Sequence, residues 1–372
     1  IGSNYRDVHG IAASHQQDAK VRIAASAPGR ICLFGEHQDY LGLPVVAAAI
    51  DVRCHIESSS REDRMVHVQL EDLGTSLCFD LDDLPEPAPR AYWLSALKVA
   101  DTEGWLPQSG WNASVKSTIP QQAGASSSTA LVVAWCALIA ARSGQSVNAE
   151  WVACAAHRAE VTYFNEPGGQ MDHFACALGG IHRFAFEPHF EAFAMPVPTG
   201  SWLLLNSLQP KDTLTLLHRA KAERVQLLEA WSATWRLTSS AMPPPFPESF
   251  DAKQRALMEG TLELRDISER GSEALRSLPT QPASWARLLT QHHRLLRDVL
   301  HVSTDRIEAI LNASGLAGAW GGKINGSGGG GTCFVVGPPD SIDDVQKAAE
   351  NTGAHAIPIA LGGIGVEVFY QD

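Results

Sequence analysis

Alternating apolar and polar positions divide the chain into short strands and longer helices. Trp111, Ala113 and Val115 alternate with polar residues, which is the period of a strand with one buried face. Residues 130–141 are almost wholly apolar, and this run predicts a buried helix soon after that strand. The same patterns predict further strands at residues 66–70, 202–205, 332–336 and 363–370, and helices at residues 92–99, 151–164, 174–178, 213–235, 252–277 and 285–300.

The segment 20–42 begins as a strand, is expected to turn at Pro28 and Gly29, and then gathers polar groups. These polar groups lie within ten residues of one another and are Arg30, Glu36, His37 and Asp39. Such a cluster suits a polyol site, because carboxylates accept hydrogen bonds from hydroxyls while histidine and arginine donate them. A solvated turn with chance charges is the alternative.

The loop between the strand at 111–116 and the helix at 130–141 is built from small and polar residues. Pro120 ends the strand, Gly124 permits a close approach of the backbone, and three serines, Ser126 to Ser128, stand where the helix begins. The first turn of a helix has free N–H groups and a partial positive charge, so this loop can hold a polyphosphate without a lysine. A polar N-cap on a core helix is the alternative.

Two carboxylates downstream of this loop lie in positions that favour contact with a ligand. Glu160 lies among small and apolar neighbours of the helix at 151–164, so it is either a solvated charge or a ligand that points into a cleft. A turn with two glycines then delivers Asp172 to the start of the next helix. Because a helix N-terminus stabilises a carboxylate, Asp172 is either a helix cap or a catalytic base.

Composition limits the class of protein. With 372 residues, 45% of them hydrophobic, the chain can bury a substantial core and form two domains. A formal charge of −12 disfavours a nucleic acid or an anionic membrane as partner, because phosphates attract basic faces. The seven scattered cysteines predict reduced, mostly buried thiols. Residues 1–20 are too polar for a signal peptide, and no apolar run reaches the roughly 20 residues of a bilayer span, so we expect a soluble, cytoplasmic protein.

A glycine-rich segment, residues 321–331, comes directly before the predicted strand at 332–336. That much glycine, without low-complexity surroundings, indicates backbone packed tightly against a neighbour or a ligand. His292 and His293 lie together in the helix at 285–300, and adjacent positions diverge around a helix, so the pair does not suit a shared metal ion. We expect these histidines to be solvated or to cap the helix.

Three of these stretches together resemble the superfamily of galactokinase, homoserine kinase, mevalonate kinase and phosphomevalonate kinase (the GHMP kinases). Residues 28–40 are similar to the galactokinase sugar signature, residues 120–130 to the phosphate loop, and residues 321–332 to the glycine-rich third motif. The resemblance implies an ATP-dependent small-molecule kinase with an α+β fold. It also implies an N-terminal mixed α/β domain at residues 20–200, a ferredoxin-like C-terminal domain at residues 201–372, and an active site between them.

The resemblance implies roles for individual residues. Asp172 matches the catalytic base of galactokinases, and Arg30 matches the arginine that favours its ionised form. Ser128 and Glu160 match ligands of Mg²⁺, which with ATP is an implied cofactor. The positions that match sugar-binding residues are Glu36, His37, Asp39 and Gly169. The positions that match the surroundings of the ATP phosphates are Gly124, Ala125, Ser126, Ser127, Ser128, Gly326, Gly328 and Gly329.

The chain departs from galactokinases near these motifs. Cys32, Gln38 and His173 stand where galactokinases usually have asparagine, threonine and glutamine. No tyrosine follows residues 206–213, where galactokinases commonly offer one to the sugar, and His218 is the nearest counterpart. These differences leave open which sugar is used.

Mevalonate kinases are the nearest other class of substrate specificity. They usually carry lysine at the position of Arg30 and lack an acid at the position of Asp39. A carboxylate there would be a costly neighbour for the carboxylate of mevalonate, whereas a neutral sugar tolerates it. We therefore predict that the protein phosphorylates the anomeric hydroxyl of galactose or a related aldose. We also predict that it is a monomer or a weak dimer. A mevalonate-type kinase and a non-catalytic sensor of sugar and nucleotide are the alternatives.

Overall fold

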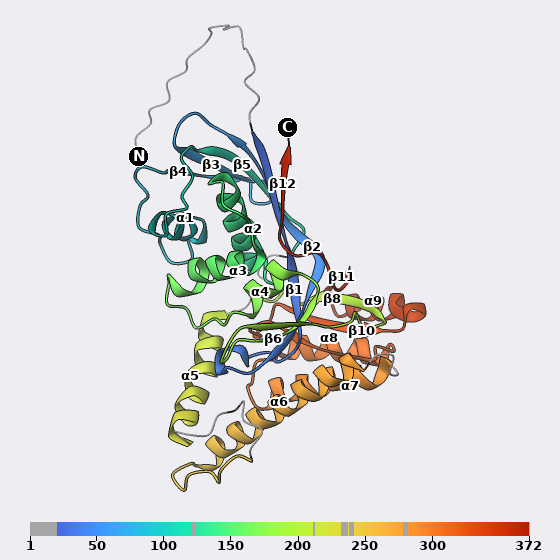
Figure 1. Ribbon diagram of the computed structural model, residues 1–372. Helices are drawn as coiled ribbons and strands as arrows, with labels where there is room; N and C mark the ends of the chain where they lie inside the picture. Colours follow the sequence, from blue (N-terminus) through green and yellow to red (C-terminus); the bar gives the residue numbers. More distant parts are fainter. Residues whose placement is uncertain are drawn as a thin grey trace, which may run out of the picture.

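The structure is a computed structural model that describes residues 21–120, 124–210, 213–231, 237, 242–277 and 282–371. Two β-sheets carry helices packed against them (Figure 1). Two regions named in the sequence analysis lie outside the described residues: residues 1–20, which were expected not to be a signal peptide, and residues 121–123 of the predicted phosphate loop. Among the helices in the described ranges, none has the length and apolar character that a bilayer span requires.

Within the described ranges, the larger sheet follows the order β12-β1-β2-β5-β3-β4, with β6 beside β2 and β7 beside β6. Its neighbouring strands are antiparallel, except that β3 and β5 run parallel. Its strands are β1 (Arg22–Phe34), β2 (Val45–Ser60), β3 (Met65–Leu70), β4 (Thr75–Asp80), β5 (Trp111–Ser117), β6 (Ile181–Ala185), β7 (Glu191–Ala194) and β12 (Glu367–Gln371).

Four helices pack together beside this sheet (Figure 1). They are α1 (Tyr92–Thr102), α2 (Ser127–Arg142), α3 (Ala149–His157) and α4 (Met171–Leu178). Helix α2 is buried along most of its length, as its apolar run predicts, and it contacts β1, β2 and the other three helices. Trp135 of α2 lies edge-on to Trp93 of α1, with ring centroids 4.9 Å apart, so the aromatic residues of both helices contribute to one core.

The smaller sheet follows the order β11-β8-β10-β9 and is antiparallel throughout its described strands. It consists of β8 (Ser201–Asn206), β9 (Gly321–Asn325), β10 (Thr332–Gly337) and β11 (His355–Ile359). The helices of this part are α5 (Thr213–Trp231), α6 (Ala252–Arg276), α7 (Pro282–Asp298), α8 (Asp305–Leu316) and α9 (Ile342–Asn351). Apolar residues from α7, α8 and α9 form a second core with one face of the sheet. The division of the chain into domains at residues 200 and 201 stays a prediction. The last strand, β12, pairs with β1 and so belongs to the larger sheet.

The predicted turn at Pro28 and Gly29 is wrong, because β1 continues through both residues to Phe34. Strand β12 pairs with β1 only from Arg22 to Ser26. Pro28 therefore has no paired strand on the β12 side of β1, and the N–H group that proline lacks is not needed for a hydrogen bond to β12. The pairing with β2 shifts register between Pro28 and Arg30, which accommodates the irregular backbone without ending the strand.

The expectation that His292 and His293 are solvated is also wrong. His292 is fully buried and stacks against Phe34 at the end of β1, with ring centroids 6.1 Å apart. His293 accepts a hydrogen bond from the backbone N–H of Ile324 in β9 and contacts Glu308 of α8 at 2.8 Å. The two side chains diverge from α7 as expected, and they join this helix to both sheets.

The predicted helix at residues 151–164 is two elements. Regular α-helix ends at His157, and a π-helical turn, η2 (Arg158–Thr162), follows and contains Glu160. Such turns widen the backbone spiral and occur frequently at functional sites.

Candidate active site

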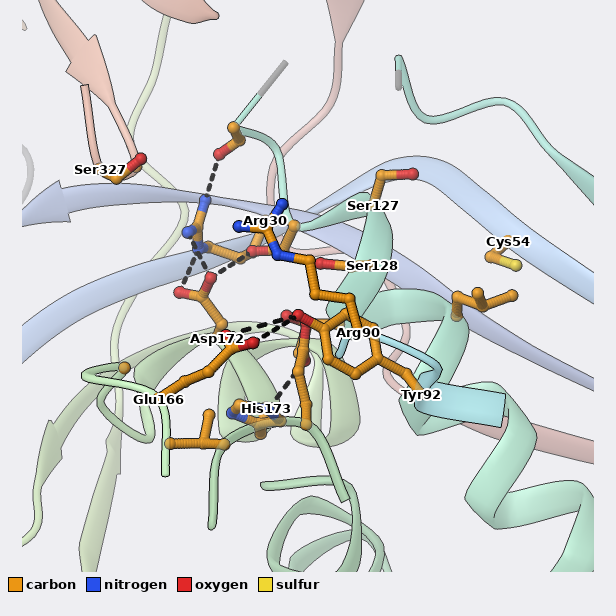
Figure 2. Close-up of a pocket in the computed structure, with 18 of the residues that line it drawn as sticks. Arg30, Cys54, Arg90, Tyr92, Ser127, Ser128, Glu166, Asp172, His173 and Ser327 are labelled. Atoms are coloured by element: carbon orange, nitrogen blue, oxygen red, sulfur yellow. Dashed lines mark hydrogen bonds and ion pairs between the residues drawn. The ribbon is translucent and has the colours of Figure 1, made fainter. Parts of the chain in front are cut away.

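A cavity of about 580 Å³ brings together residues from distant parts of the chain (Figure 2). Its lining comes from the end of β1 and the segment after it, from the loop and first turn of α2 together with the region of η2 and α4, and from the turn after β9. Residues of β2, β3, β5 and the start of α1 complete the lining. The predicted site residues that line the cavity are Arg30, Glu36, His37, Asp39, Gly124, Ser126, Ser127, Ser128, Glu160, Gly169, Asp172 and Gly326. Ala125, Gly328 and Gly329 are not among its lining residues, and their contact with ATP stays a prediction.

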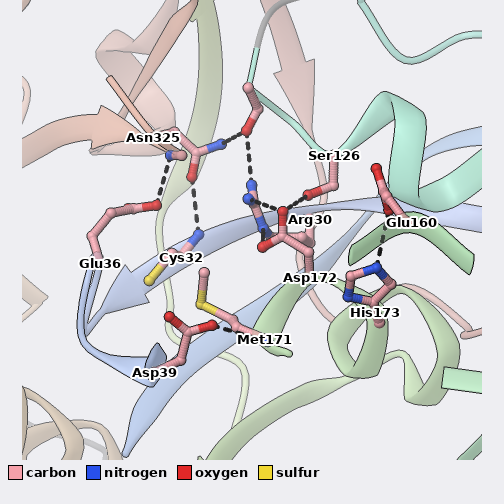
Figure 3. Close-up of polar contacts among 12 residues, drawn as sticks. Arg30, Cys32, Glu36, Asp39, Ser126, Glu160, Met171, Asp172, His173 and Asn325 are labelled. Carbon is pink, nitrogen blue, oxygen red and sulfur yellow. Dashed lines mark hydrogen bonds and ion pairs between the residues drawn. The ribbon is translucent and has the colours of Figure 1, made fainter. Parts of the chain in front are cut away.

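Asp172, the second residue of α4, is held by three hydrogen bonds in the wall of this cavity (Figure 3). Arg30 donates from Nε to Oδ1 at 2.8 Å and from Nη2 to Oδ2 at 2.6 Å. Ser126 donates its hydroxyl to Oδ2 at 2.7 Å. A carboxylate offers about four acceptor positions, so one on Oδ1 is left for a hydroxyl of a substrate.

The surroundings of Asp172 keep its carboxylate ionised. Burial by itself raises the pKa of Asp172, but the charge and hydrogen bonds of Arg30 and the hydroxyl of Ser126 outweigh burial and hold the pKa below its ordinary value of 3.8. Arg30 also donates Nη1 to the carbonyl of Gly124 at 2.8 Å, so one guanidinium joins α4 to the phosphate loop. The arrangement fixes a carboxylate anion beside the loop for which the sequence predicts phosphate binding.

The start of α2 is shaped for an anion. Ser126 precedes the helix with a left-handed backbone, φ 59°, and its side chain does not cap the helix because it donates to Asp172 instead. The alternative in which Ser126 is only a polar N-cap is therefore wrong. Strand β1 passes close by, and a Cβ on Gly29 would lie 2.8 Å from the carbonyl oxygen of Ala125. The uncapped first turn faces the cavity with Ser127 and Ser128.

Asp39 also lines the cavity, and within the part of the chain that the structure describes its carboxylate accepts hydrogen bonds from backbone N–H groups rather than from a cationic side chain. Its Oδ1 accepts from the N–H of Tyr40 at 2.9 Å and its Oδ2 accepts from the N–H of Met171 at 3.2 Å. The chain at Gly169 passes so close that an added Cβ would lie 1.8 Å from Asp39 Oδ2. Glycine at this position is therefore required for the placement of Asp39.

We expect Gly169→Ala to raise the KM for the acceptor substrate by about 10-fold or more, because small misplacements of a binding group are costly. The new methyl group must displace the carboxylate of Asp39. Gly315→Ala is the matched control, since a Cβ there meets nothing within 4 Å. Steady-state kinetics of both variants, with circular dichroism to check folding, test this prediction. An unchanged acceptor KM in Gly169→Ala would show that Asp39 does not contact the substrate.

Burial raises the pKa of Asp39 above its ordinary value of 3.8, and the N–H groups of Met171 and Tyr40 offset only part of that effect. Because Asp172 has a lowered pKa, Asp39 protonates first as the pH falls. Protonated Asp39 accepts hydrogen bonds poorly, so kcat/KM for the acceptor should decline on the acid side at a pH above 3.8. Asp39→Asn should lower kcat/KM and remove this acid limb, and a variant that keeps the limb would assign it to another group.

Glu160 projects from η2 and is 6% exposed. Its Oε2 lies 3.0 Å from His173 Nε2, and the ring of His173 packs edge-on against His157 (Figure 3). Burial, together with the neighbouring His173, lowers the pKa of His157 to about 3, so His157 is neutral at physiological pH. Because a carboxylate oxygen accepts, His173 donates Nε2–H to Glu160 and fixes the orientation of its carboxylate.

Oxygen donors in the cavity fit Mg²⁺, although the described residues contain no group of three or more histidines, cysteines or acids arranged for a metal ion. The hydroxyl of Ser128 and the carboxylate of Glu160 both line the cavity. Mg²⁺ commonly takes one or two protein ligands and completes its shell with water and substrate phosphates. The two predicted ligands are consistent with that mode of binding.

Two residues that contact the predicted site residues without lining the cavity were not anticipated from the sequence. Lys323 and Asn325 of β9 contact β1 and the segment that follows it. Lys323 contacts Glu36, and Asn325 accepts a hydrogen bond from the N–H of Cys32 at 3.0 Å. They are polar residues at alternate positions in a short glycine-rich segment, which places both side chains on one face of a strand. That alternation could have identified them. His218 lies in α5, but its side chain falls outside the described residues.

Comparison with known proteins shows which families and relatives the chain resembles. Three family models match the chain: the GHMP kinases N terminal domain at residues 91–180, the GHMP kinases C terminal domain at residues 273–355, and the galactokinase galactose-binding signature at residues 13–59. A mevalonate kinase from Thermococcus gammatolerans is 26% identical, covering 94% of this chain and 98% of the relative. A galactokinase from Roseiflexus sp. is 27% identical, covering 84% and 82%.

Solved structures show the same fold. The chain matches Lactococcus lactis galactokinase complexed with galactose with a TM-score of 0.81 and 20% identity, covering 93% of this chain and 95% of that one. It matches Methanococcus jannaschii mevalonate kinase with a TM-score of 0.72 and 18% identity, covering 93% and 100%. The chain therefore belongs to the GHMP kinase superfamily and has its two-domain α+β fold. Within that superfamily of ATP-dependent phosphotransferases, its signature makes it a galactokinase-like member.

Proposed function

We propose that this kinase transfers the γ-phosphoryl group of ATP to the anomeric hydroxyl of galactose or a related aldose, with Mg²⁺ as cofactor. The observation that carries the proposal is the carboxylate of Asp172, held by Arg30 and Ser126 in the same cavity as the start of α2. A hydroxyl and a polyphosphate bound there would approach each other at Asp172.

In the proposed mechanism, Asp172 accepts a hydrogen bond from the attacking hydroxyl and takes its proton as the bond to phosphorus forms. The lowered pKa of Asp172 makes it a weak base, but an ionised one. A weak base suffices because the transition state of phosphoryl transfer is loose and the proton leaves late. Arg30 holds Asp172 ionised and lies beside the phosphate loop, where its charge opposes the negative charge of the phosphates.

The first turn of α2, at Ser126 to Ser128, would hold the phosphates through its free N–H groups. Ser128 and Glu160 would hold Mg²⁺, which when bound neutralises phosphate charge. His173 keeps the carboxylate of Glu160 oriented toward the cavity. Because ATP is the donor, we place the protein in the cytoplasm, as a monomer or weak dimer without nucleic-acid or membrane partners.

Asp39 supports a sugar over mevalonate as the acceptor. It is a largely buried carboxylate without a cationic hydrogen-bond partner in the described residues, so a second carboxylate on the substrate would be repelled there. Hydroxyl groups of a sugar would instead donate to it. A mevalonate-type kinase is the second candidate, because relatives named mevalonate kinase cover 94% of the chain at 26% identity.

Release of ADP, measured with ATP, Mg²⁺ and a panel of monosaccharides beside mevalonate, tests the proposal. We expect turnover that requires both a sugar and Mg²⁺ and that stops when a chelator is added. Turnover of mevalonate alone would favour the second candidate. A non-catalytic sensor would bind sugar and nucleotide but release no ADP, so the same assay distinguishes it.

A further inference from the structure

A second cavity, of about 550 Å³, lies between α7, α8 and the paired strands β9 and β10. Both helices pack beside the smaller sheet (Figure 1). Among the residues that the structure describes, none lines both this cavity and the candidate active site. Sites for small molecules have volumes of about 300–1,000 Å³. The second cavity is therefore large enough for a small ligand and separate from the site of phosphoryl transfer.

Glycines shape two walls of this cavity. Gly321 and Gly322, at the start of β9, both line it. An added Cβ on Gly321 would lie 2.0 Å from the carbonyl oxygen of Ala286, so the strand approaches α7 with no side chain between them. Gly315 of α8 also lines the cavity, and an added Cβ there would meet nothing within 4 Å. A larger side chain at position 315 therefore has room to occupy the cavity.

Positive charge dominates the polar part of the lining. Helix α7 contributes the guanidinium groups of Arg287, Arg294 and Arg297, whereas Glu308 of α8 is the one carboxylate among the described lining residues. Glu308 is already engaged, since it lies 2.8 Å from His293 and accepts a hydrogen bond from Arg297 at 3.0 Å. The whole chain has a formal charge of −12, so the charge of this cavity is opposite to that of the molecule.

Arg287 and Arg294 are the cations that remain available to a ligand. Both are exposed, and neither has a hydrogen-bond or ion-pair partner among the described residues. They are two helical turns apart on one face of α7, which separates their backbones by about 10 Å along the axis. A guanidinium group binds phosphate oxygens through paired N–H donors. The two side chains can therefore approach one phosphate from both sides.

The lining also has an apolar part. Leu311 and Leu316 of α8, Trp320 before β9 and Val335 of β10 contribute to it. Leu316 is 83% exposed, and Trp320 is half-buried. A ligand with an apolar body would remove this surface from water, which is favourable, whereas inorganic phosphate would leave it exposed. Arginines beside apolar side chains suit a molecule that carries both a phosphate and a ring or other apolar group.

From these features we propose that the second cavity binds a small organic phosphate. Arg287 and Arg294 hold its phosphate group. Trp320 and Leu316 contact its apolar body. Nucleic acid is disfavoured as the ligand, because the net negative charge of the chain repels a long polyanion. The proposal does not depend on which acceptor the kinase phosphorylates, since no described residue lines both cavities.

Calorimetric titration with phenyl phosphate tests the proposed site. The protein is first saturated with ADP and Mg²⁺, so that the predicted phosphate loop is occupied. We expect one phenyl phosphate to bind per chain, and the double variant Arg287→Gln, Arg294→Gln to raise its Kd by about 10-fold or more. The KM for ATP should equal that of the wild type, because both arginines lie outside the candidate active site.

The matched control for charge is the double variant Arg270→Gln, Arg276→Gln. These two arginines are exposed on α6 and line neither cavity. Their replacement removes the same charge from the chain, and because distant surface charges are screened by salt it should change the Kd for phenyl phosphate by less than about 3-fold. An equal loss of affinity in both double variants would show a general effect of charge and contradict the assignment of the arginines.

Gly315→Leu fills the cavity without removing a charge. Leucine forms helices better than glycine, so α8 should be preserved, and thermal unfolding checks this. We expect the Kd for phenyl phosphate to rise by about 10-fold or more, because the new side chain takes the place of the ligand. Unchanged affinity in both Gly315→Leu and the double variant of Arg287 and Arg294 would overturn the proposal, as would a wild-type protein that binds no phenyl phosphate.

Inorganic phosphate, titrated in the same way, tests the apolar contact. We expect it to bind about 5-fold or more weakly than phenyl phosphate, because it leaves Leu316 and Trp320 in water. Equal affinities would contradict the assignment of the cavity to an organic phosphate.

Discussion

Replacement of Asp172 by asparagine should lower kcat by about 10²-fold or more while galactose and ATP still bind. Asparagine keeps the size of the side chain and can still accept from Arg30 or Ser126 through its carbonyl oxygen, but its amide does not take up a proton. Single-turnover rates and calorimetric binding constants separate these effects. We expect the binding constants to change by far less than the rate.

The matched control for this variant is Asp298→Asn. Asp298 is also paired with an arginine, Arg297, at 2.7 Å, but it lies on α7, away from the cavity. The variant Asp298→Asn should leave kcat unchanged. Near-wild-type turnover in Asp172→Asn would show that Asp172 is a helix cap and that another group receives the proton.

Replacement of Glu160 by glutamine should raise the Mg²⁺ concentration needed for half-maximal rate by about 10-fold or more. A neutral amide binds a hard cation more weakly than a carboxylate does, but saturation with metal can refill a weakened site. Added Mg²⁺ should therefore restore part of the activity of Glu160→Gln and none of that of Asp172→Asn. A titration of initial rate against Mg²⁺ measures both effects.

Glu308→Gln controls for the loss of a glutamate–histidine contact. Glu308 lies 2.8 Å from His293, as Glu160 lies 3.0 Å from His173, but Glu308 does not line the cavity. Its Mg²⁺ requirement should equal that of the wild type. Equal rescue of Glu160→Gln and Asp172→Asn by metal would contradict the assignment of ligand and base.

Local patterns predicted most of the regular structure. Alternation identified β3 and β5, and the apolar run identified α2 within a few residues of its ends. The pattern did not predict that β1 continues through Pro28, because that depends on where β12 stops pairing. The π-helical turn after α3 likewise leaves no signal in the spacing of apolar residues.

The sequence motifs identified residues that line one cavity, but not the contacts among them. Arg30 and Asp172 are 142 positions apart, and their double hydrogen bond follows only from the packing of α4 against β1. Glu36 and Lys323 are 287 positions apart, and burial of both determines that they pair. A motif therefore indicates which side chains gather, whereas the folded chain determines which of them remain available to a ligand.

The chemistry at the anomeric position provides the most direct test of the proposed function. ADP release should be measured with ATP, Mg²⁺ and one of three acceptors: galactose, methyl galactoside, whose anomeric oxygen is blocked, or mevalonate. We predict rapid release with galactose, and release at the background rate with methyl galactoside and with mevalonate. Release with mevalonate alone, or equal release with galactose and methyl galactoside, would contradict the assignment of this protein as a sugar 1-kinase.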